Sequence, residues 1–443
     1  MKLNELRQAA REIVSAALKS VDPETLIHRM VRLEDGRLAI GANSVDLSGF
    51  RKILVVGAGK AGAAMAKAIE SILGDRVNGG LVIVQDGNRS PLKKLELAEA
   101  GHPVPDERGV EAAGRILSLL QDHANANTLV LCLISGGGSA LMSLPASAIP
   151  LSAKQQTTGL LLRCGATVDE INIVRKHISK IKGGQLARAA FPAKLFSLIL
   201  SDVIGDQIEV IASGPTVGDP STFSDAVAVL KKHEVWEQTP TTVREFLEKG
   251  LRGEIPETPK PGERIFENVC NVIIGSNRTA VESASKRASS LGFHSLVLST
   301  RICGEAREVG GIFASIAIES EISGYPIAPP ACILAGGETT VTVRGEGKGG
   351  RNQELALSAA IRLAGARRIV VASVGTDGAD GPTDAAGAVV DTTTLERAKR
   401  LELDPAQYLR NNDSYHLLAP IGDLVITGPT GTNVMDLIVA LIG

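Results

Sequence analysis

Apolar runs rich in β-branched residues alternate with Ala- and Leu-rich helical stretches over the first half of the chain. Such alternation predicts βαβ units and a largely parallel sheet. The expected strands end in Gly, Asp or Ser, so polar and flexible residues lie at the carboxyl ends of strands, where open α/β sheets bind ligands. These strands are residues 53–57, 80–86, 128–135 and 195–202.

The pattern lapses near residues 253–264, where three prolines, two glycines and alternating charges indicate a linker or an exposed loop. A second α/β series follows, with expected strands at residues 269–277, 295–300, 332–343, 368–378 and 424–428. We therefore predict two α/β domains with the active site in the cleft between them. The first, residues 1–250, is Rossmann-like with a mostly parallel sheet. The second, residues 265–443, is smaller with a mixed sheet. The N-terminal helix, residues 1–18, is compatible with either domain.

Composition narrows the class of protein. Of 443 residues, 44% are apolar and 22% charged, which is typical of a soluble globular protein. A net charge of −2 gives no electrostatic reason to expect nucleic acid or a membrane as a partner. Five scattered cysteines without a C-x-x-C pair favour buried reduced thiols over disulfides or a zinc site. With no signal-peptide core and no apolar run long enough for a bilayer, we expect a cytoplasmic protein, and a homodimer remains open.

Residues 51–70 contain a G-x-G-x-x-G spacing after an apolar strand, formed by Gly57, Gly59 and Gly62. This spacing favours a dinucleotide site. Lys60, however, lies inside the turn, where a cation at the first turn of a helix opposes the helix dipole. An anion bound between the lysine and the helix end would interact favourably with both. The stretch therefore leaves open a dinucleotide or a phosphoryl group.

Residues 131–143 form the second motif. A strand ends at Ser135, three glycines follow, and Ser139 begins a helical pattern. Successive unhindered N–H groups at a helix N-terminus bind phosphate or carboxylate, although an ordinary turn also fits. Asp202 ends another strand, where a carboxylate holds Mg²⁺ or accepts a proton from a substrate hydroxyl. The basic residues of 171–187 read instead as a solvated helix face, with His177 structural.

The second domain contains a basic glycine-rich segment at residues 335–354. Arg344, Lys348 and Arg351 are interleaved with glycines, which suits multidentate phosphate binding, although no P-loop pattern is present. Carboxylates at Glu338 and in the loop 375–388 are candidate Mg²⁺ ligands. The acids of that loop are Asp377, Asp380 and Asp384, and Asn277, which follows the strand at 269–277, is a further candidate binding residue.

Taken together, these motifs resemble those of the class II glycerate 2-kinases, the family with a C-terminal MOFRL domain, in the same order over nearly the whole chain. The stretches concerned are GAGKAG, LISGGGSAL, INIVRKHISKIKGGQLA, LSDVIGD, ASGPTVGDPSTF, GGETTVTVRGEGKGGRNQE, GTDGADGPTDAAGA and TGPTGTNVMDL. The resemblance implies transfer of phosphate from ATP, with Mg²⁺, to the 2-hydroxyl of D-glycerate, giving 2-phosphoglycerate and ADP.

The resemblance also implies roles for individual residues. Lys60 corresponds to a lysine acting at the transferred phosphoryl group, Arg351 to an active-site arginine, and Asp377 and Asp384 to an acidic loop. The loop expected to hold nucleotide phosphates or the substrate carboxylate consists of Ser135, Gly136, Gly137, Gly138 and Ser139.

Two alternatives remain. An NAD(P)H-dependent hydroxypyruvate reductase would bind its cofactor at the glycine turn, and Asp86, at the end of the next strand, would bind the ribose. The spacing from Gly62 to Asp86 is slightly long for that role. His102 is the one candidate for its catalytic histidine. A non-catalytic regulator that binds sugar phosphates would need no acidic residues for a metal, and no basic DNA-binding element is visible.

Overall fold

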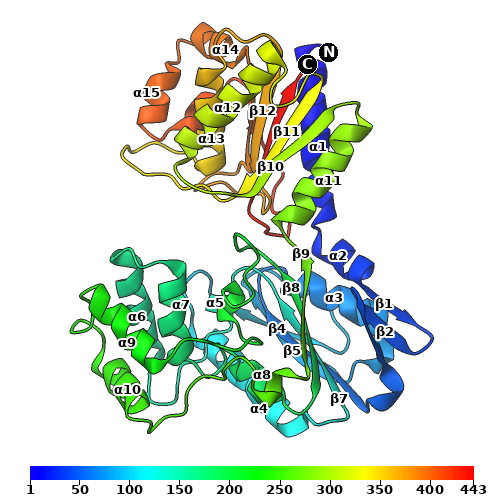
Figure 1. Cartoon of the computed structure of the whole chain (residues 1–443), viewed down its shortest axis with the longest axis vertical. Coiled ribbons are helices and arrows are strands. Elements are labelled where there is room, and N and C mark those ends of the chain that lie inside the picture. The colour runs from blue at the N-terminus through cyan, green and yellow to red at the C-terminus, as the bar shows by residue number, and fades with distance from the viewer. The chain divides into compact units, whose positions relative to one another are not determined.

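The computed structural model describes residues 1–443, which divide into two compact units. The continuous unit comprises Leu26–Ile274. The composite unit combines Met1–Thr25 with Gly275–Gly443 (Figure 1). The N-terminal helix thus belongs to the unit formed by the end of the chain, and the division falls at residue 274 instead of within residues 251–264.

A six-stranded sheet in the order β6-β5-β4-β7-β8-β9 forms the centre of the continuous unit. Neighbouring strands from β6 to β8 pair in parallel, and β4 runs alongside β7 from Lys52 opposite Thr128 to Ala58 opposite Ile134. The carboxyl ends of β4, β7 and β8 therefore meet at one edge, as the sequence predicted. The bounds are β4 Lys52–Ala58, β5 Gly79–Gln85, β6 Glu96–Ala100, β7 Thr128–Ile134, β8 Lys194–Leu200 and β9 Val269–Gly275.

Strand β9 corrects one prediction, because the sequence assigned residues 269–277 to the second domain. Instead β9 is the edge strand of the first sheet, next to β8. The Asn271 side chain exchanges hydrogen bonds with Thr216, and Leu195 N–H donates to Asn268 O. The proline-rich segment 253–264 is thus a loop that returns the chain to its own sheet, and turn residues do not distinguish such a loop from a linker.

Helices cover both faces of this sheet. Helix α3 (Gly62–Leu73) packs on one face, since Gly62 approaches Val82 and Val84 of β5. The alternate β5 residues Leu81 and Ile83 belong to a core that includes α4 (Glu107–His123) and α8 (Gln185–Ala190). Side chains alternate between faces along a strand, so α4 and α8 lie opposite α3. The unit is thus a three-layer Rossmann-like domain.

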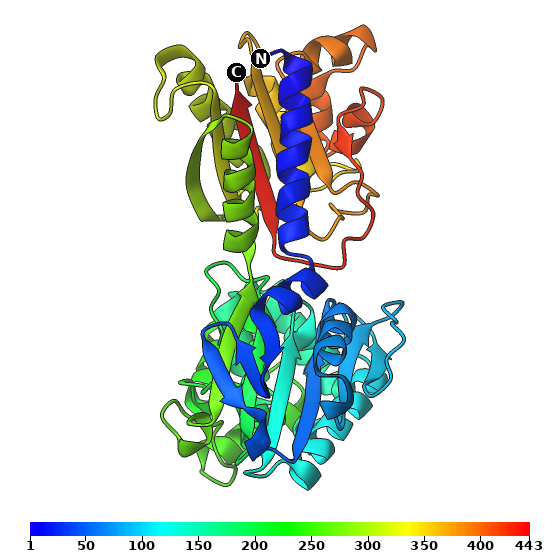
Figure 2. The same ribbon diagram turned by 90° about the vertical axis from the view of Figure 1, so that its right-hand side faces the viewer.

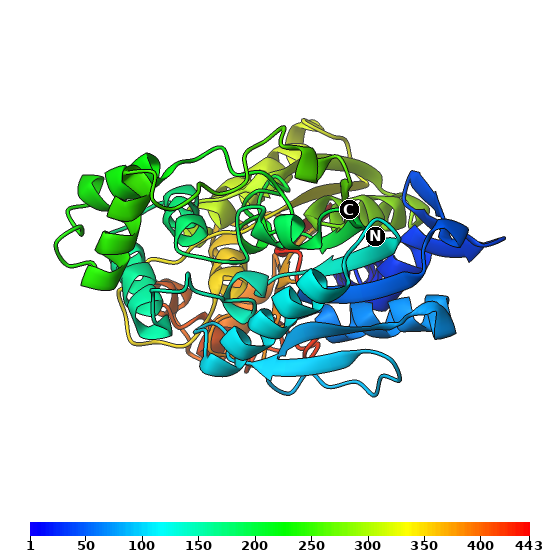
Figure 3. The same cartoon turned by 90° about the horizontal axis from the view of Figure 1, so that it is seen from below.

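Two smaller parts complete the continuous unit. A helical lobe with its own apolar core lies at one side of the sheet, as the green and teal helices of Figure 3 show. A three-stranded antiparallel sheet precedes β4. The lobe comprises α6 Leu151–Arg163, α7 Val168–His177, α9 Phe223–Lys232 and α10 Thr241–Leu251. The remaining elements are α2 Pro23–Met30, β1 Val31–Glu34, β2 Arg37–Ile40, β3 Asn43–Asp46 and α5 Gly138–Leu141.

The composite unit contains the mixed sheet that the sequence predicted, in the order β10-β11-β15-β12-β13-β14. Strands β10 and β11 are parallel and the other pairs antiparallel. The C-terminal strand β15 lies in the middle and is buried along its whole length. The bounds are β10 His294–Ile302, β11 Ala331–Gly337, β12 Ile369–Gly375, β13 Gly387–Asp391, β14 Leu424–Val425 and β15 Asp436–Ile442.

Two helices cover each face of the mixed sheet. Helices α1 (Leu3–Ser20) and α11 (Asn277–Ser290) lie side by side on one face, and α12 (Ala306–Ser323) and α13 (Arg351–Arg362) cover the other (Figures 1 and 2). The buried residues of α1 recur at helical spacing, which gives it an apolar stripe against the sheet. The short helices are α14 Thr394–Arg400, α15 Pro405–Arg410 and α16 Ser414–Leu418.

A buried ionic network ties α1 to this unit. The Arg7 guanidinium donates to Asp391 at 2.6 Å and to Asp423 at 2.7 Å. Arg397 donates to Asp423 at 2.6 Å. Both carboxylates are buried, so each depends on these guanidinium groups for compensation. Removing one partner from such a network leaves an uncompensated buried charge, which is costly.

We predict that Arg7→Gln destabilises the composite unit by about 3 kcal/mol, the cost of breaking a buried ion pair. Thermal or urea unfolding followed by circular dichroism measures the effect. Arg11→Gln on the exposed side of the same helix is the matched control and changes stability by less than about 0.5 kcal/mol. Equal unfolding midpoints for the two variants would contradict this role of Arg7.

Candidate functional site

The turn after β4 is held against the loop after β7 by backbone hydrogen bonds. Lys60 N–H donates to Gly136 O at 2.9 Å, and Ala61 N–H donates to Ser135 Oγ at 3.1 Å. Gly59 N–H donates to Ile83 O at 3.1 Å. The amide groups that a pyrophosphate would require at this turn are therefore already used within the protein.

The three glycines of the turn have packing roles. A Cβ at Gly57 would overlap the Leu133 backbone, and one at Gly59 would overlap Ser135. Both glycines also have positive φ angles, 154° and 151°. Gly62 lets α3 approach the sheet. Glycine is required because two neighbouring strands and a helix come close together at this point.

Three predicted features of the site converge beside this turn. The Lys60 ammonium makes no hydrogen bond or ion pair to a protein group. An added Cβ at Gly137 would come within 2.9 Å of the His102 ring and 3.3 Å of Lys60 Cγ, and one at Gly136 would overlap the Asp202 carboxylate. The structure thus brings Lys60, the 135–139 loop and Asp202 together, with His102 as their neighbour.

The electrostatics of this cluster shift two pKa values. Burial raises the pKa of Asp202 above its ordinary value, although its own backbone amide and the Lys60 charge act in the opposite direction. Burial, followed by the charge of Lys60, lowers the pKa of His102, so the neutral imidazole is favoured. A carboxylate with a raised pKa beside an unpaired cation is typical of functional sites.

The 135–139 loop combines open and fixed groups. The amides of Gly136 and Gly137 donate to no protein acceptor. Ser139 is fixed by a chain of hydrogen bonds, because its hydroxyl contacts Ser213 Oγ at 2.8 Å, and Ser213 Oγ donates to Asn172 at 2.9 Å. Ser213 has a left-handed backbone (φ 61°), a conformation uncommon for a residue other than glycine. The loop therefore presents free N–H groups from a rigid support.

A pocket of about 370 Å³ adjoins this loop, between α6, α7 and residues 102–105. Three basic side chains line it, with no carboxylate among the lining residues. Lys154 and Lys182 are 4% and 1% exposed, and Arg175 is partly buried. Lys182 donates to Ser139 O at 2.7 Å, whereas Lys154 Nζ and Ser143 Oγ have no hydrogen-bond partner. We call these residues the Lys154–Arg175–Lys182 pocket.

Sequence reasoning missed this pocket. The basic run 171–187 was expected to be a solvated helix face, but α7 ends at His177 and the chain then turns inward. Lys176, His177 and Lys182 are buried, and only Lys180 of the lysines is exposed. Nothing in the sequence indicated that Lys154 is buried, because a single lysine in a helical stretch ordinarily points to solvent. The density of basic residues beside a glycine pair was the one usable hint.

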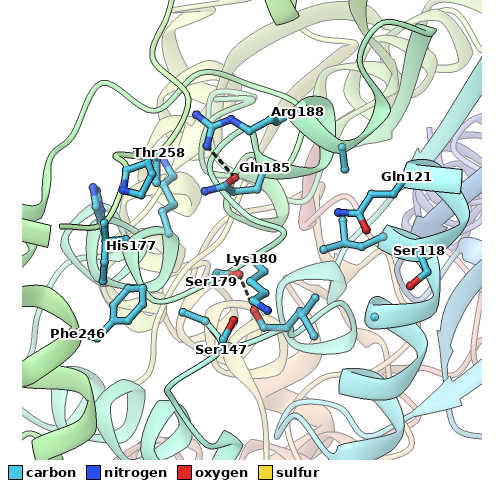
Figure 4. Close-up of a pocket in the computed structure, with 18 of the residues that line it drawn as sticks. Ser118, Gln121, Ser147, His177, Ser179, Lys180, Gln185, Arg188, Phe246 and Thr258 are labelled. Atoms are coloured by element: carbon cyan, nitrogen blue, oxygen red, sulfur yellow. Dashed lines mark hydrogen bonds between the residues drawn. The ribbon is translucent and has the colours of Figure 1, made fainter. Parts of the chain in front are cut away.

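A larger cleft of about 850 Å³ lies between α4, α8 and the helical lobe (Figure 4). Most of its basic groups are paired: Lys176 with Asp219 at 3.4 Å, His177 with Glu257 at 3.1 Å and Arg188 with Glu263 at 3.8 Å. None of the predicted site residues lines it. The smaller pocket has basic side chains without carboxylate partners, as an anionic ligand requires, so it is the better candidate for such a ligand despite its size.

In the composite unit, Arg351 begins α13 but is already engaged. Its guanidinium donates to both carboxylate oxygens of Asp436, at 2.6 and 2.9 Å, and pairs with Glu338 at 2.8 Å. Burial opposes its charge, but the two carboxylates raise the pKa of Arg351 above its ordinary value. The arginine predicted to bind phosphate is therefore charged and held in a bidentate ion pair.

The glycine-rich segment 345–350 also differs from expectation. The amides of residues 345–348 are satisfied by residues 411–413, as Gly345 N–H donates to Asn412 at 3.0 Å and Lys348 N–H to Asp413 at 2.9 Å. The Lys348 ammonium lies 4.5 Å from the Tyr415 ring centre. Asn277 is buried, and its amide donates to two backbone carbonyls at 2.8 and 2.9 Å. In this structure these groups act as internal supports.

The predicted magnesium ligands do not form a cluster. Glu338 pairs with Arg351, Asp384 accepts from Tyr415 at 2.8 Å, and Asp377 accepts from Ala379 N–H at 3.1 Å. Asp380, placed in the same acidic loop, caps α13 by accepting from the amides of Asn352 and Gln353. Over residues 1–443, no group of three or more His, Cys, Asp or Glu side chains could hold a metal ion. The residues therefore do not fit an all-protein metal cage.

Comparison with known proteins decides the family. Residues 9–248 match the model of a domain of unknown function (DUF4147), and residues 331–436 match the MOFRL family. A Pyrococcus horikoshii protein named glycerate 2-kinase is 43% identical over 99% of this chain and 98% of its own. The chain belongs to the class II glycerate 2-kinase family.

Two further relatives of this family add detail. A Thermotoga maritima protein named D-glycerate 2-kinase is 43% identical over 99% of this chain and 98% of its own. The crystal structure of T. maritima glycerate kinase matches with a TM-score of 0.89 at 42% identity, covering 99% of this chain and all of that one. An Agrobacterium vitis protein, 42% identical over 99% of this chain and 94% of its own, is named putative hydroxypyruvate reductase.

Names in the class II glycerate 2-kinase family thus cover both chemistries, and the surroundings of Asp86 and of the glycine turn bear on the second of them. A reductase would need Asp86 free to bind ribose hydroxyls. Instead its two carboxylate oxygens accept from Arg108 at 2.7 and 2.9 Å. With the turn amides also occupied, the chain's own residues do not provide a dinucleotide site at β4.

None of the chain's helices combines the length and apolar composition needed to span a bilayer.

Proposed function

We propose that this protein transfers a phosphoryl group from ATP to the 2-hydroxyl of D-glycerate, producing 2-phosphoglycerate and ADP. One observation carries the proposal: the unpaired Lys60 ammonium lies beside the open 135–139 loop and the Asp202 carboxylate. The names of the relatives support glycerate as the acceptor. Phosphoryl transfer depends on positioning and on charge neutralisation, which these groups can supply.

Lys60 neutralises the charge that develops on the phosphoryl oxygens. Its backbone amide is fixed to Gly136, so the stem of the side chain starts from a defined point beside Gly137. Because no carboxylate pairs with its ammonium, the charge is available to the substrate. A preorganised cation of this kind stabilises a transition state without the cost of reorganisation.

Asp202 accepts the proton of the attacking 2-hydroxyl. Burial raises the pKa of this carboxyl and so makes it a stronger base than an exposed aspartate. The neighbouring Lys60 charge keeps the carboxylate ionised enough to act. His102 is favoured in its neutral form by burial and by Lys60, so it adds no further positive charge beside the loop.

The remaining groups bind and orient the reactants. The free amides of Gly136 and Gly137 donate to phosphate or carboxylate oxygens. We propose that Mg²⁺ enters with ATP, held mainly by phosphate oxygens, as is usual for this ion. The predicted participants from the composite unit stay predictions: Arg351, Lys348, Asp377 and Asp384. To contact the substrate, the Arg351 guanidinium would have to bind it in addition to Asp436.

The direct test supplies purified protein with ATP, Mg²⁺ and D-glycerate, and separately with hydroxypyruvate and NADH or NADPH. We expect ADP formation that depends on glycerate, with phosphate on the 2-hydroxyl of the product, identified by ³¹P NMR. Oxidation of the nicotinamide in the second reaction, without ADP formation in the first, would replace this proposal with the reductase. Inactivity in both would leave only a binding role.

We predict that Lys60→Met lowers kcat by roughly 10²- to 10³-fold, because a transition-state contact is lost, while KM for ATP changes only a few-fold. Steady-state kinetics measure both constants. Lys67→Met, which removes an exposed lysine from α3, is the matched control and retains activity. A Lys60 variant with normal kcat would exclude the lysine from the chemistry.

Asp202 gives a pH-dependent prediction. As pH falls through the raised pKa of Asp202, the carboxylate gains a proton and kcat/KM declines, at a pH above the ordinary aspartate range. Asp202→Asn removes this acidic limb and lowers kcat roughly 10²- to 10⁴-fold. In Lys60→Met the limb moves to higher pH, because the cation that lowers the pKa is gone. An acidic limb that survives in Asp202→Asn belongs to another group.

A further inference from the structure

The Lys154–Arg175–Lys182 pocket holds three basic side chains without a carboxylate partner. No carboxylate lines it, and the shifts in the pKa values of Lys154 and Lys182 come from burial and from the other cations. Burying an unpaired ammonium costs several kcal/mol, and burial accordingly lowers the pKa of both lysines, so their full protonation requires a compensating negative charge. An anionic ligand would supply the missing charge.

Two polar atoms point to the same conclusion. Lys154 Nζ and Ser143 Oγ are buried without hydrogen-bond partners, and both residues line the pocket. Lys154 is 4% exposed, so water does not satisfy its ammonium as it would at the surface. Buried donors in folded proteins almost always find a partner. Phosphate oxygens would accept from both groups.

Charge and position indicate which anion belongs here. A glycerate carboxylate brings one negative charge against three cations, whereas a polyphosphate chain brings three or more. The volume of about 370 Å³ leaves room for more than a three-carbon acid. Gly137 and Ser139 line the pocket as well, so it opens onto the loop beside Lys60. A chain of phosphates would extend from the pocket toward that lysine.

We propose that the Lys154–Arg175–Lys182 pocket binds the polyphosphate chain of the nucleotide and directs its terminal phosphate toward Lys60. This assignment rests on the proposed kinase function and adds to it which loop faces the nucleotide. Lys154 on α6 and Arg175 on α7 contact the phosphates. Lys182, tied to Ser139 at 2.7 Å, links the pocket to the loop.

The charged groups facing Lys154 give the site a pH dependence. They are Arg175 from α7, Lys182 from the segment after α7, and the half-buried His102 from the opposite loop. Burial and then Arg175 lower the pKa of Lys154 to about 7. A bound anion favours its protonated form, so affinity for polyphosphate falls as pH rises above 7. Tripolyphosphate gains negative charge over the same pH range, which by itself would raise its affinity for basic groups. A fall in affinity therefore reports the loss of the proton from Lys154.

The experiment measures binding to the full chain by titration calorimetry, with inorganic tripolyphosphate, ADP and D-glycerate as separate probes. Lys154→Met and Arg175→Gln should each weaken tripolyphosphate and ADP about 10- to 100-fold, the usual effect of losing a buried charge-assisted hydrogen bond. Glycerate affinity should stay within about 3-fold. Lys180→Met, which removes an exposed charge from the same segment, is the matched control.

Stability separates loss of binding from loss of structure. Because each substitution removes an uncompensated buried charge, the thermal midpoint of the unliganded variants should equal or exceed that of the wild type. Circular dichroism before each titration checks the fold. A variant that unfolds is replaced by the other of the pair, since Lys154 and Arg175 lie on different helices.

Each remaining outcome has a distinct meaning. Loss of glycerate binding alone would overturn the proposal and make the pocket a carboxylate site. Unchanged binding of all probes would also overturn it. If the wild type forms ADP from glycerate but the variants keep tripolyphosphate affinity, the pocket assignment fails and the kinase function stands. If the wild type forms no ADP yet both variants lose tripolyphosphate, the polyphosphate site stands and the kinase function fails.

Discussion

The proposed site depends on the hydrogen bonds that join the turn after β4 to the loop after β7. These strands are parallel neighbours, so their carboxyl ends lie together, but adjacency alone does not orient the loops. Lys60 N–H to Gly136 O and Ala61 N–H to Ser135 Oγ provide that orientation. The approach is so close that only glycine fits at residue 59. As a result, Lys60 and the free amides of the loop face the same space.

The basic residues of the candidate site differ from those that support the composite unit. In the composite unit, Arg7, Arg351 and Arg397 each pair with buried carboxylates, and the pairs fix helices to the sheet. In the continuous unit, Lys60, Lys154 and Lys182 have no carboxylate partner. Paired charges serve structure, whereas unpaired buried charges reduce stability until a ligand binds. This contrast favours an anion site in the continuous unit.

Much of the fold could be predicted from the sequence, because strand and helix periodicities are local signals. The parallel sheet follows from this alternation, and the shared position of Lys60, Asp202 and Ser135–Ser139 follows from where their strands end. Strand β9 was assigned to the wrong sheet, since a proline-rich loop and a linker share one composition. The burial of Lys154 depends on tertiary packing, and so do the partners of Arg351. No local pattern encodes either.

The glycine turn shows why one motif supports two readings. Glycine is needed wherever backbone approaches closely, whether the neighbour is a pyrophosphate or another strand. Here the neighbour is the segment Leu133–Ser135, so the spacing reports packing between β4 and β7. Hydrogen bonds connect the same loop to the helical lobe. Ser139 accepts from Lys182 and, through Ser213, is linked to Asn172 on α7. An anion neutralising Lys154 and Lys182 would stabilise this connection, because it binds only the folded arrangement of these residues.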